Sequence, residues 1–259
     1  GTTFKSVTNE LGKFAISTVK VGGPYTITAE LDGFTPGKVE NLFVKLGEKK
    51  DVKFLMKLAT IKEADIEVTA SSPIINSSRT GAAQNVTSDA IDNLPTIGRD
   101  ISSFTRMSPQ MVSGEDSGSF SAGGSSSRYN NIQIDGAQNN DLFGLGNSGT
   151  PGGQTGTTPI SMEAIQEFQI VMAPYDIKYG GFTGGGVNVI TKTGTNKLHG
   201  SAFFYGRNES LARKGDSKGD LAELSEFSET TFGLTLGGPI VKNKLFFFLS
   251  FENKDEKSQ

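Results

Sequence analysis

The most regular pattern of apolar and polar positions lies in the last quarter of the chain, residues 196–259. Residues 198–207, 230–238 and 245–252 have roughly the 9–11 residues that a β-strand needs to cross a membrane. In the second segment, large apolar residues alternate with small or polar ones, which puts the two kinds on opposite faces of a strand. The pattern predicts antiparallel strands, either of a membrane barrel or of a soluble sheet.

The third segment and the connections refine this prediction. Its apolar face would carry Leu245, Phe247, Leu249 and Phe251, whereas Phe246 and Phe248 would point inward. Residues 208–229 form a long charged connection, and residues 239–244 form a short one. Outer-membrane barrels have long external loops and short periplasmic turns, so we expect the first strand to run outward.

A second patterned stretch, residues 159–195, precedes these strands. Ser161 stands at a helix N-cap position and Glu163 in the first turn, where the helix dipole favours an acid. The predicted elements are a helix at 162–167, a strand at 168–172, a glycine-rich turn at 179–186 and a strand at 187–191. Their order predicts a mixed α/β body.

The first 58 residues show short alternating segments separated by turn residues, which is typical of a small β-sandwich. The candidate strands are residues 3–8, 13–17, 25–30, 37–46 and 49–58, with turns at 9–12, 22–24 and 32–33. A carbohydrate- or ligand-binding role for Phe14, Tyr25 and Phe34 is the alternative to the interpretation that we favour, in which they form the core of this sandwich.

The remaining residues alternate between linkers and short elements. Residues 59–94 are rich in Ala, Ser, Thr and Asn and predict a linker. Ser/Asp capping before an apolar period predicts a helix at 100–107. Residues 113–127 and 141–156 have the composition of loops, and between them Ile132 and Ile134 indicate a strand that ends in a turn at residues 135–136.

Composition narrows the possible chemistry. The 259 residues include 33 Gly and 18 Phe but no Cys or Trp, which suits a β-rich protein. Without Cys, a disulfide scaffold, a Cys-ligated zinc site and a thiol nucleophile are excluded. The net charge of −3 indicates no nucleic-acid partner, and no apolar run approaches the ~18 residues of a membrane helix.

No motif predicts catalysis, a metal site or a cofactor. His199 is the single histidine, so a His-rich metal site is excluded. The glycines at 184–186 precede a strand and lack the GK[ST] of a phosphate-binding loop, and no serine stands in a G-x-S-x-G elbow. The sequence therefore predicts a protein that is not an enzyme.

The series formed by an acidic helix, the EFQI strand, YGG and GGGVNVITK resembles the last third of the plug domain of TonB-dependent outer-membrane receptors. Residues 91–111 and the run LGGPIVKNKLFFFLSFE resemble the Oar-like subgroup of these receptors. The N-terminal residues resemble a carboxypeptidase-regulatory-like domain, whose pattern falls on Thr8, Gly12, Phe14, Gly23, Tyr25, Gly33 and Phe34.

This resemblance implies a β-rich α+β chain in four parts. The first two are a regulatory-like β-sandwich at 1–60, truncated at its start, and a linker at 61–90. The last two are a mixed α/β plug at 91–195 and the first antiparallel strands of a transmembrane β-barrel at 196–259. Plugged transporters have about 22 strands. We therefore expect a fragment whose remaining strands follow Gln259. A TonB box is implied within the linker, with TonB contacts at Asp65, Ile66, Glu67, Val68, Thr69 and Ala70, although these residues could equally form an ordinary edge strand.

The resemblance also assigns plug residues. Arg128 and Asp135 would form a buried ion pair, which suits the bidentate geometry of arginine. Backbone geometry would depend on further residues: Gly136, Tyr179, Gly180, Gly185 and Gly186. Phe143 and Asn147 would face the ligand, unless their loop has no such role.

The implied function is uptake across the outer membrane of a ligand too large or scarce for porins, with the plug gating the barrel lumen. The implied partners are TonB, outer-membrane lipid and an extracellular ligand. The plug and the N-terminal domain would lie on the periplasmic side. A secreted or surface-attached β-rich adhesin without transport is the alternative.

Overall fold

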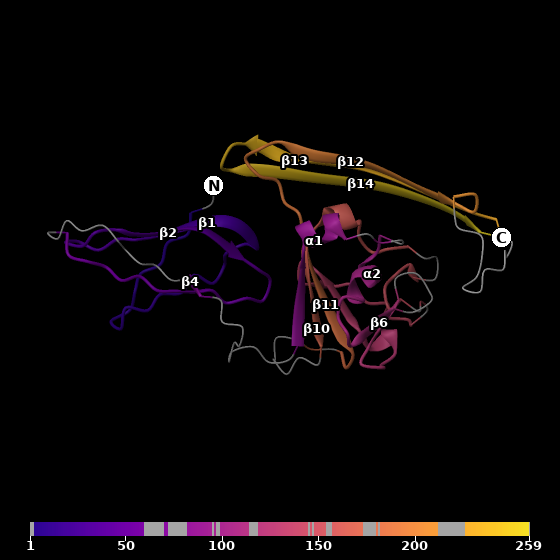
Figure 1. Ribbon diagram of the computed structural model, residues 1–259, viewed down its shortest axis with the longest axis horizontal. Helices are drawn as coiled ribbons and strands as arrows, with labels where there is room; N and C mark the ends of the chain where they lie inside the picture. Colours follow the sequence, from indigo (N-terminus) through magenta and orange to yellow (C-terminus); the bar gives the residue numbers. More distant parts are fainter. Residues whose placement is uncertain are drawn as a thin grey trace.

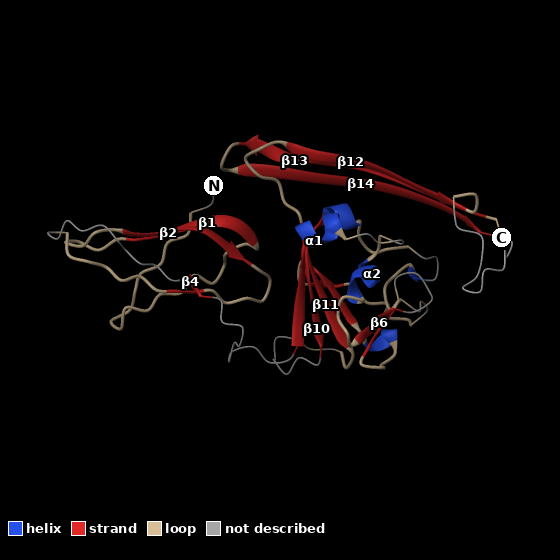
Figure 2. Ribbon diagram, viewed as in Figure 1, coloured by secondary structure: helices blue, strands red, loops and turns tan. Residues whose placement is uncertain are grey.

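The computed structural model describes residues 3–59, 70–71, 82–94, 96, 99–113, 119–144, 146, 148–153, 157–172, 180, 182–211 and 226–258. They form an N-terminal portion (residues 3–59 and 70–71), a central domain of strands and short helices (residues 82–194), and a long three-stranded sheet that passes over the central domain (Figure 1). Strands are more extensive than helices in all three parts, and loops make up much of the N-terminal portion (Figure 2). The fold is thus rich in strands, with few helices, as predicted.

The central domain is built on a five-stranded sheet with the strand order β5-β10-β11-β8-β9. The strands are β5 Ala82–Thr87, β10 Ile165–Met172, β11 Gly185–Thr191, β8 Asn131–Ile134 and β9 Ala137–Gln138. β11 and β8 are parallel, and the other neighbours are antiparallel. The strand predicted around Ile132 and Ile134 is confirmed. Its turn follows at Asp135 and Gly136, which both have positive φ angles.

One face of this sheet forms the core of the central domain. Phe168 and Ile170 of β10 are almost fully buried and pack with valines of the neighbouring strands. Phe104 meets Phe168 edge-on, with 5.9 Å between the ring centroids. Burying one side chain of this size contributes roughly 1.5–3 kcal/mol, so this face supplies much of the domain's stability. The elements that pack on it are α1 Ser88–Asn93, α2 Ile101–Thr105, β6 Met111–Ser113 and β7 Phe120–Ala122.

The helices are short, and none among the described residues is long and apolar enough to cross a membrane. The predicted helix at 100–107 is confirmed in a shorter form, α2. Its N-cap is Asp100, whose Oδ1 accepts the backbone N–H of Ser103 at 2.7 Å. The predicted loop at 113–127 contains one element that the prediction lacked, β7, and the loop shares its end residues with β6 and with the 3-10 turn η1 Ser127–Tyr129.

The helix predicted at 162–167 is wrong in its second half. Only the 3-10 turn η3 Met162–Ala164 forms, and the strand β10 already begins at Ile165. An irregularity in the pairing with β11 between Ile165 and Glu167 lets Ile165 join the same core as Phe168. Ser161 makes no capping hydrogen bond, and its hydroxyl donates instead to Glu252.

The predicted linker at 61–90 is also wrong at its C-terminal end. β5 pairs with β10 from Met172↔Ala82 to Glu167↔Thr87, and α1 follows it directly. β5 has one large apolar residue, Val86, which is fully buried. A six-residue strand with a single apolar anchor has too little alternation to be recognised, and its pairing with β10 stabilises it instead.

In the N-terminal portion, β1 Gly22–Ala29 pairs antiparallel with β2 Gly37–Val44. The stretch predicted as a strand at 49–58 contributes only β3 Asp51–Val52, which pairs with β4 Ala70–Ser71. Residues 3–8 and 13–17 form no strand. The predicted turns at 9–12 and 32–33 form, whereas residues 22–24 begin β1. The described residues thus contain two small strand pairs rather than the predicted sandwich of five strands.

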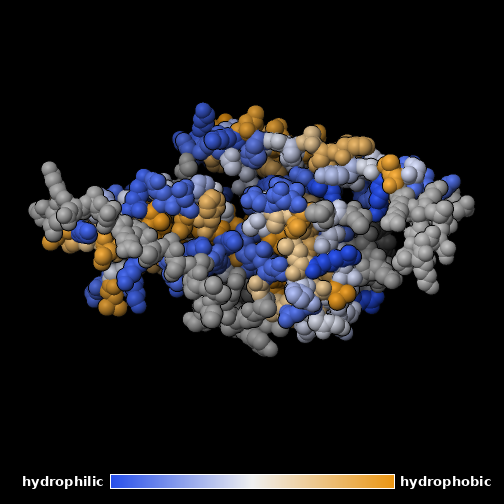
Figure 3. Space-filling view, viewed as in Figure 1, coloured by the Kyte–Doolittle hydropathy of each residue, from blue (hydrophilic) through white to orange (hydrophobic). Residues whose placement is uncertain are grey.

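The three C-terminal segments are confirmed as strands: β12 His199–Asn208, β13 Phe227–Val241 and β14 Leu245–Ser258. Leu234 pairs with Phe251, and Leu236 with Leu249, and all four side chains are exposed. Gly233, between the exposed Phe232 and Leu234, is buried. Hydrophobic residues gather on the outer side of this sheet (Figure 3). The alternation predicted from the sequence therefore separates an outer apolar face from an inner face toward the central domain.

Gly185 in β11 tests how tightly the central domain packs. A Cβ there would lie 2.8 Å from Ala122 Cβ and 2.9 Å from Met111 Cε, whereas a Cβ at Gly180 would meet nothing within 4 Å. We expect Gly185→Ala to cost about 1–3 kcal/mol of unfolding free energy, as overpacking does. Gly180→Ala should change it by less than ~1 kcal/mol. Hydrogen exchange of the β10 and β11 amides measures both, and equal effects would contradict the packing seen here.

Candidate functional site

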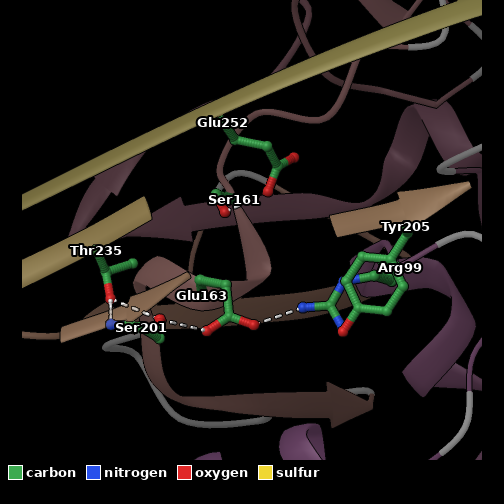
Figure 4. A network of polar contacts seen from close by, with 7 residues as sticks. All are labelled: Arg99, Ser161, Glu163, Ser201, Tyr205, Thr235 and Glu252. Atoms are coloured by element: carbon green, nitrogen blue, oxygen red, sulfur yellow. Dashed lines mark hydrogen bonds and ion pairs between the residues drawn. The ribbon is translucent and has the colours of Figure 1, made fainter. Parts of the chain in front are cut away.

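The candidate site is the polar contact between the central domain and the inner face of the three-stranded sheet (Figure 4). Arg99 directly precedes the Asp100 cap of α2, and Glu163 lies in η3, so two short helical elements present their side chains to the sheet. Arg99 Nη2 and Glu163 Oε1 are 2.6 Å apart, and the two side chains are 24% and 14% exposed. This pair is therefore shielded from most of the solvent that screens surface ion pairs.

Arg99 also binds the inner face of β12. Its Nη1 donates to the hydroxyl of Tyr205 at 2.7 Å. Its Cζ lies 4.3 Å from the centroid of the Tyr205 ring and 5.2 Å from that of Phe203. A guanidinium over an aromatic face gains cation–π attraction in addition to its hydrogen bonds. One arginine thus joins η3 to two aromatic residues of the sheet.

Two further contacts extend the site along the sheet. Ser201 of β12 donates to Glu163 Oε2 at 3.4 Å and shares a 2.7 Å hydrogen bond with Thr235 of β13. Ser161 donates to Glu252 Oε2 of β14 at 2.5 Å. All three strands therefore take part in the network, and the central domain contacts the sheet through its polar inner face.

We call this network the anchor, because its groups can hold the central domain and the sheet together. It consists of Arg99, Ser161, Glu163, Ser201, Tyr205, Thr235 and Glu252. Its groups are one cation, two carboxylates and several hydroxyls, most of them bonded to one another. Among the described residues no group of three or more His, Cys, Asp or Glu side chains could hold a metal ion. The ion pair holds Arg99 and Glu163 in place within the central domain, and their bonds to Tyr205 and Ser201 hold this domain against the sheet.

The predicted ion pair between Arg128 and Asp135 is wrong. Both residues are exposed, and the ion pairs between described residues do not include one that joins them. Asp135 instead accepts the backbone N–H of Thr191 at 3.0 Å and its hydroxyl at 2.7 Å. The carboxylate thus fastens the β8–β9 turn to the end of β11, which a short-range bond can do without a buried cation.

The predicted glycines lie at different kinds of position. Gly136 has a φ of +85° in the β8–β9 turn, a conformation that favours glycine. Gly185 and Gly186 face side chains at close range, among them Phe182 at 3.1 Å from the Cβ position of Gly186. Gly180 has open space around it. Tyr179 lies outside the described residues.

The predicted ligand and partner residues are only partly described. Phe143 is 83% exposed in a loop where Asp141 accepts the backbone N–H groups of Phe143 and Gly146. Ala70 belongs to β4 and pairs with Val52. The other predicted residues lie outside the described ranges: Asn147, Asp65, Ile66, Glu67, Val68 and Thr69.

The amino-acid pattern did not predict the anchor, although two of its residues carry a signal in the sequence. Tyr205 and Glu252 each directly follow an outward-facing phenylalanine of a predicted strand, so their side chains point inward. Arg99 had no such signal, because its partners are 64 and 106 residues away in sequence.

Two family models match the chain in adjacent ranges. Residues 76–187 match the TonB-dependent Receptor Plug Domain, and residues 190–259 match an Outer membrane beta barrel domain. The boundary between the matches falls where the central domain meets the three-stranded sheet. The chain joins the plug of a TonB-dependent receptor to strands of its outer-membrane barrel. The central domain is accordingly called the plug below, β12–β14 the barrel strands, and the protein is placed in an outer membrane.

Named relatives agree with this assignment. The chain is 27% identical over 261 aligned positions to the TonB-dependent transporter Oar of Myxococcus xanthus, a match that covers 95% of this chain and 23% of Oar. It is 35% identical over 91 residues to the probable TonB-dependent siderophore receptor PirA of Acinetobacter baumannii, covering 35% of this chain and 10% of PirA. The chain therefore spans less than a quarter of the length of these curated relatives, which are named as a transporter and a receptor.

A solved structure shows the same fold. The outer membrane transporter YddB from Escherichia coli superposes with a TM-score of 0.52 over 67% of this chain and 26% of its own, at 14% sequence identity. At this identity the likeness concerns the fold alone.

Arg99 is the residue whose loss should loosen the plug most. Removing one partner of a buried pair costs about 3–5 kcal/mol. Because Arg99 and Glu163 keep some exposure, we expect Arg99→Ala to cost about 2 kcal/mol. Tyr205→Phe removes only the hydroxyl acceptor and should cost about 1 kcal/mol. Hydrogen exchange of the η3 and α2 amides in the full receptor reports the change.

Arg106→Ala is the matched control for this experiment. Arg106 follows α2, and the contact described for its side chain is an exposed hydrogen bond from Nε to Ser113 Oγ, which lies outside η3. It should leave exchange at η3 unchanged. If Arg99→Ala and Arg106→Ala have the same effect on η3, Arg99 does not anchor the plug.

Proposed function

We propose that this chain is part of an outer-membrane active transporter, in which the plug gates the barrel lumen and a ligand too large or scarce for porins is taken up. The observation that supports this most is the two-faced sheet β12–β14. Its outer face is apolar, as lipid requires, and its inner face bonds the plug through the Arg99 network. Among the described residues, the contacts of this network that join the plug to the sheet are hydrogen bonds and the stacking of Arg99 on aromatic rings, which suits a plug that is retained and can also move.

The proposed energy source is TonB, and the proposed contact is the segment at residues 65–70. Its sequence, DIEVTA, is β-branched in a polar surrounding, which suits addition of an extended strand to a partner's sheet. The segment precedes β5, an edge strand of the plug sheet. Tension on it would therefore reach the plug through β5.

We further propose that the protein belongs to the Oar-like subgroup and carries a regulatory-like domain at its N-terminus. The match to Oar extends over 95% of this chain and thus includes the N-terminal portion. The proposed domains are the regulatory-like domain at 1–60, the linker from 61, the plug up to 195 and the barrel strands from 196. Because β5 lies in the plug sheet and α1 follows it directly, we place the end of the linker near residue 81 rather than 90.

The ligand is proposed to be extracellular and to contact the plug loop around Phe143 and Asn147. Phe143 is 83% exposed in this loop and is therefore accessible to such a ligand. A siderophore is one candidate, because PirA is named as a siderophore receptor. An adhesin without transport is less well supported, since it needs neither an apolar outer face nor a plug.

Site-directed cross-linking tests the TonB proposal. The chain has no Cys, so a single cysteine is a unique reactive site. We expect Val68→Cys in the full-length receptor to form a disulfide with a cysteine introduced into TonB, in cells with an energised inner membrane. Leu55→Cys, at an exposed position of the N-terminal portion, is the matched control and should not cross-link.

Cross-linking at both positions or at neither would contradict the proposed contact. The barrel is checked separately by migration of the unboiled and boiled receptor in a detergent gel. Migration that boiling does not change would count against a barrel, whatever the cross-linking shows.

A further inference from the structure

A row of amide side chains crosses the plug sheet on the face opposite its core. Directly paired residues of neighbouring strands point to the same face. In this sheet the register pairs one Asn or Gln of each strand with one of the next strand. The row consists of Asn85 (β5), Gln169 (β10), Asn188 (β11), Gln133 (β8) and Gln138 (β9). Glu167 lies on the same face, two residues before Gln169. This face is therefore polar, whereas the other face is the apolar core.

One end of the row binds the backbone of a single residue of the N-terminal portion, Leu46. The backbone N–H of Leu46 donates to Glu167 Oε1 at 3.0 Å. The carbonyl oxygen of Leu46 accepts from Asn85 Nδ2 at 2.8 Å and from Gln169 Nε2 at 2.9 Å. Both polar backbone groups of one residue are thus satisfied by three side chains from two adjacent strands.

The three side chains are also bonded to one another. Asn85 Nδ2 donates to Glu167 Oε1 at 2.8 Å, and Gln169 Nε2 donates to Asn85 Oδ1 at 2.9 Å. Glu167 and Gln169 are 3% and 2% exposed. Buried polar groups cost free energy unless they are hydrogen-bonded, so the fixed orientation of this trio favours an occupant with one donor and one acceptor.

The following residue shows how closely the loop approaches the sheet. Gly47 has a φ of +67°, and a Cβ there would lie 2.7 Å from Gln169 Nε2. Glycine meets both requirements, the backbone conformation and the lack of a side chain. Lys50 and Glu48 of the same loop form an ion pair at 3.0 Å. The loop is therefore shaped for this contact.

We propose that Asn85, Glu167 and Gln169 form a peptide-binding latch, whose occupant is Leu46 and whose role is to hold the N-terminal portion against the plug. The bond between Asn85 and Leu46 closes a stretch of 39 residues. Both ends of that stretch are then fixed at one point of the plug sheet. A pull on the chain between them is shared by β5 and the latch, so the latch sets how much force reaches β5.

This inference goes beyond the proposed function, because the latch is a property of the chain that exists with or without transport. Only its effect on force transmission rests on the proposed TonB contact. The occupant is a segment of the same chain, since it is already seated there and no partner is needed to complete the hydrogen bonds of Leu46.

Hydrogen exchange of the Leu46 amide in the full-length receptor tests the latch. We expect Glu167→Ala and the double variant Asn85→Ala/Gln169→Ala to accelerate this exchange about tenfold, on the scale of a hydrogen bond with a charged acceptor. Glu167→Gln keeps an acceptor oxygen at the same place and should retain most of the protection. Asn188→Ala is the matched control, because Asn188 belongs to the same row but is not among the side chains that bond Leu46.

Three results would overturn the latch. The Leu46 amide could exchange as fast as an unprotected amide in the parent chain while β10 and β11 stay protected. Asn188→Ala could accelerate it as much as the trio variants, which would indicate a general loosening of the sheet. The trio variants could also leave it unchanged. None of these readouts depends on ligand, TonB or uptake, so a failed transporter proposal leaves the test valid.

The pH dependence of the same amide gives a further prediction. Burial raises the pKa of Glu167 above its ordinary value of 4.5. The hydrogen bonds from Leu46 and Asn85 and the nearby charge of Lys45 lower this pKa, and the charge of Glu48 raises it, but burial has the largest effect. The closed latch thus binds a proton more tightly than the open one, and its stability falls as the pH rises from 4.5 through the raised pKa.

We therefore expect protection of the Leu46 amide, corrected for the intrinsic exchange rate, to decrease over this pH interval in the parent chain. Glu167→Gln removes the titrating group and should abolish the dependence. A dependence that persists in Glu167→Gln would show that another group controls the latch.

Discussion

The alternation of side chains along β10 is the constraint on which the rest of the plug depends. Phe168 and Ile170 point into the core, while Glu167 and Gln169 point to the other face. Because β10 lies between β5 and β11, its register aligns the neighbouring valines with the core and the neighbouring amides with the opposite face. A shift of one residue would exchange the two faces, so core packing and the latch are fixed by the same pairing.

Side chains of the barrel strands also alternate between two faces, of which one is directed outward and the other toward the plug. Leu234 and Leu249 face outward, and Ser201 and Tyr205 face the plug. Arg99 contacts this inner face through a hydrogen bond to Tyr205 and through stacking on its ring. Its ion pair with Glu163 holds the arginine in place within the plug. The plug is thus held from two sides, by the anchor at Arg99 and by the latch at Leu46. Neither contact involves a side chain of the apolar core.

The sequence predicted those features whose cause is local. The three barrel strands follow from alternation over eight or more residues, and the cap of α2 follows from Asp100. Features with a non-local cause were missed or misjudged. β5 is a strand because β10 pairs with it, and residues 165–167 continue β10 instead of the η3 turn because β11 supplies hydrogen-bond partners. In the N-terminal portion, residues 3–8 have the alternation of a strand but pair with nothing along a ladder.

For the candidate sites the division is the same. The amino-acid sequence by itself determined the periodicities, the turn at Asp135 and Gly136, and a set of motifs similar to those of TonB-dependent receptors. It could not indicate that Arg99 would meet Tyr205, or Leu46 meet Asn85 and Gln169, since these residues are 106, 39 and 123 positions apart. It also suggested a partner for Asp135 that the fold does not supply. Strand periodicity is a property of neighbouring residues, whereas a polar contact between domains depends on register and docking, which only the tertiary structure decides.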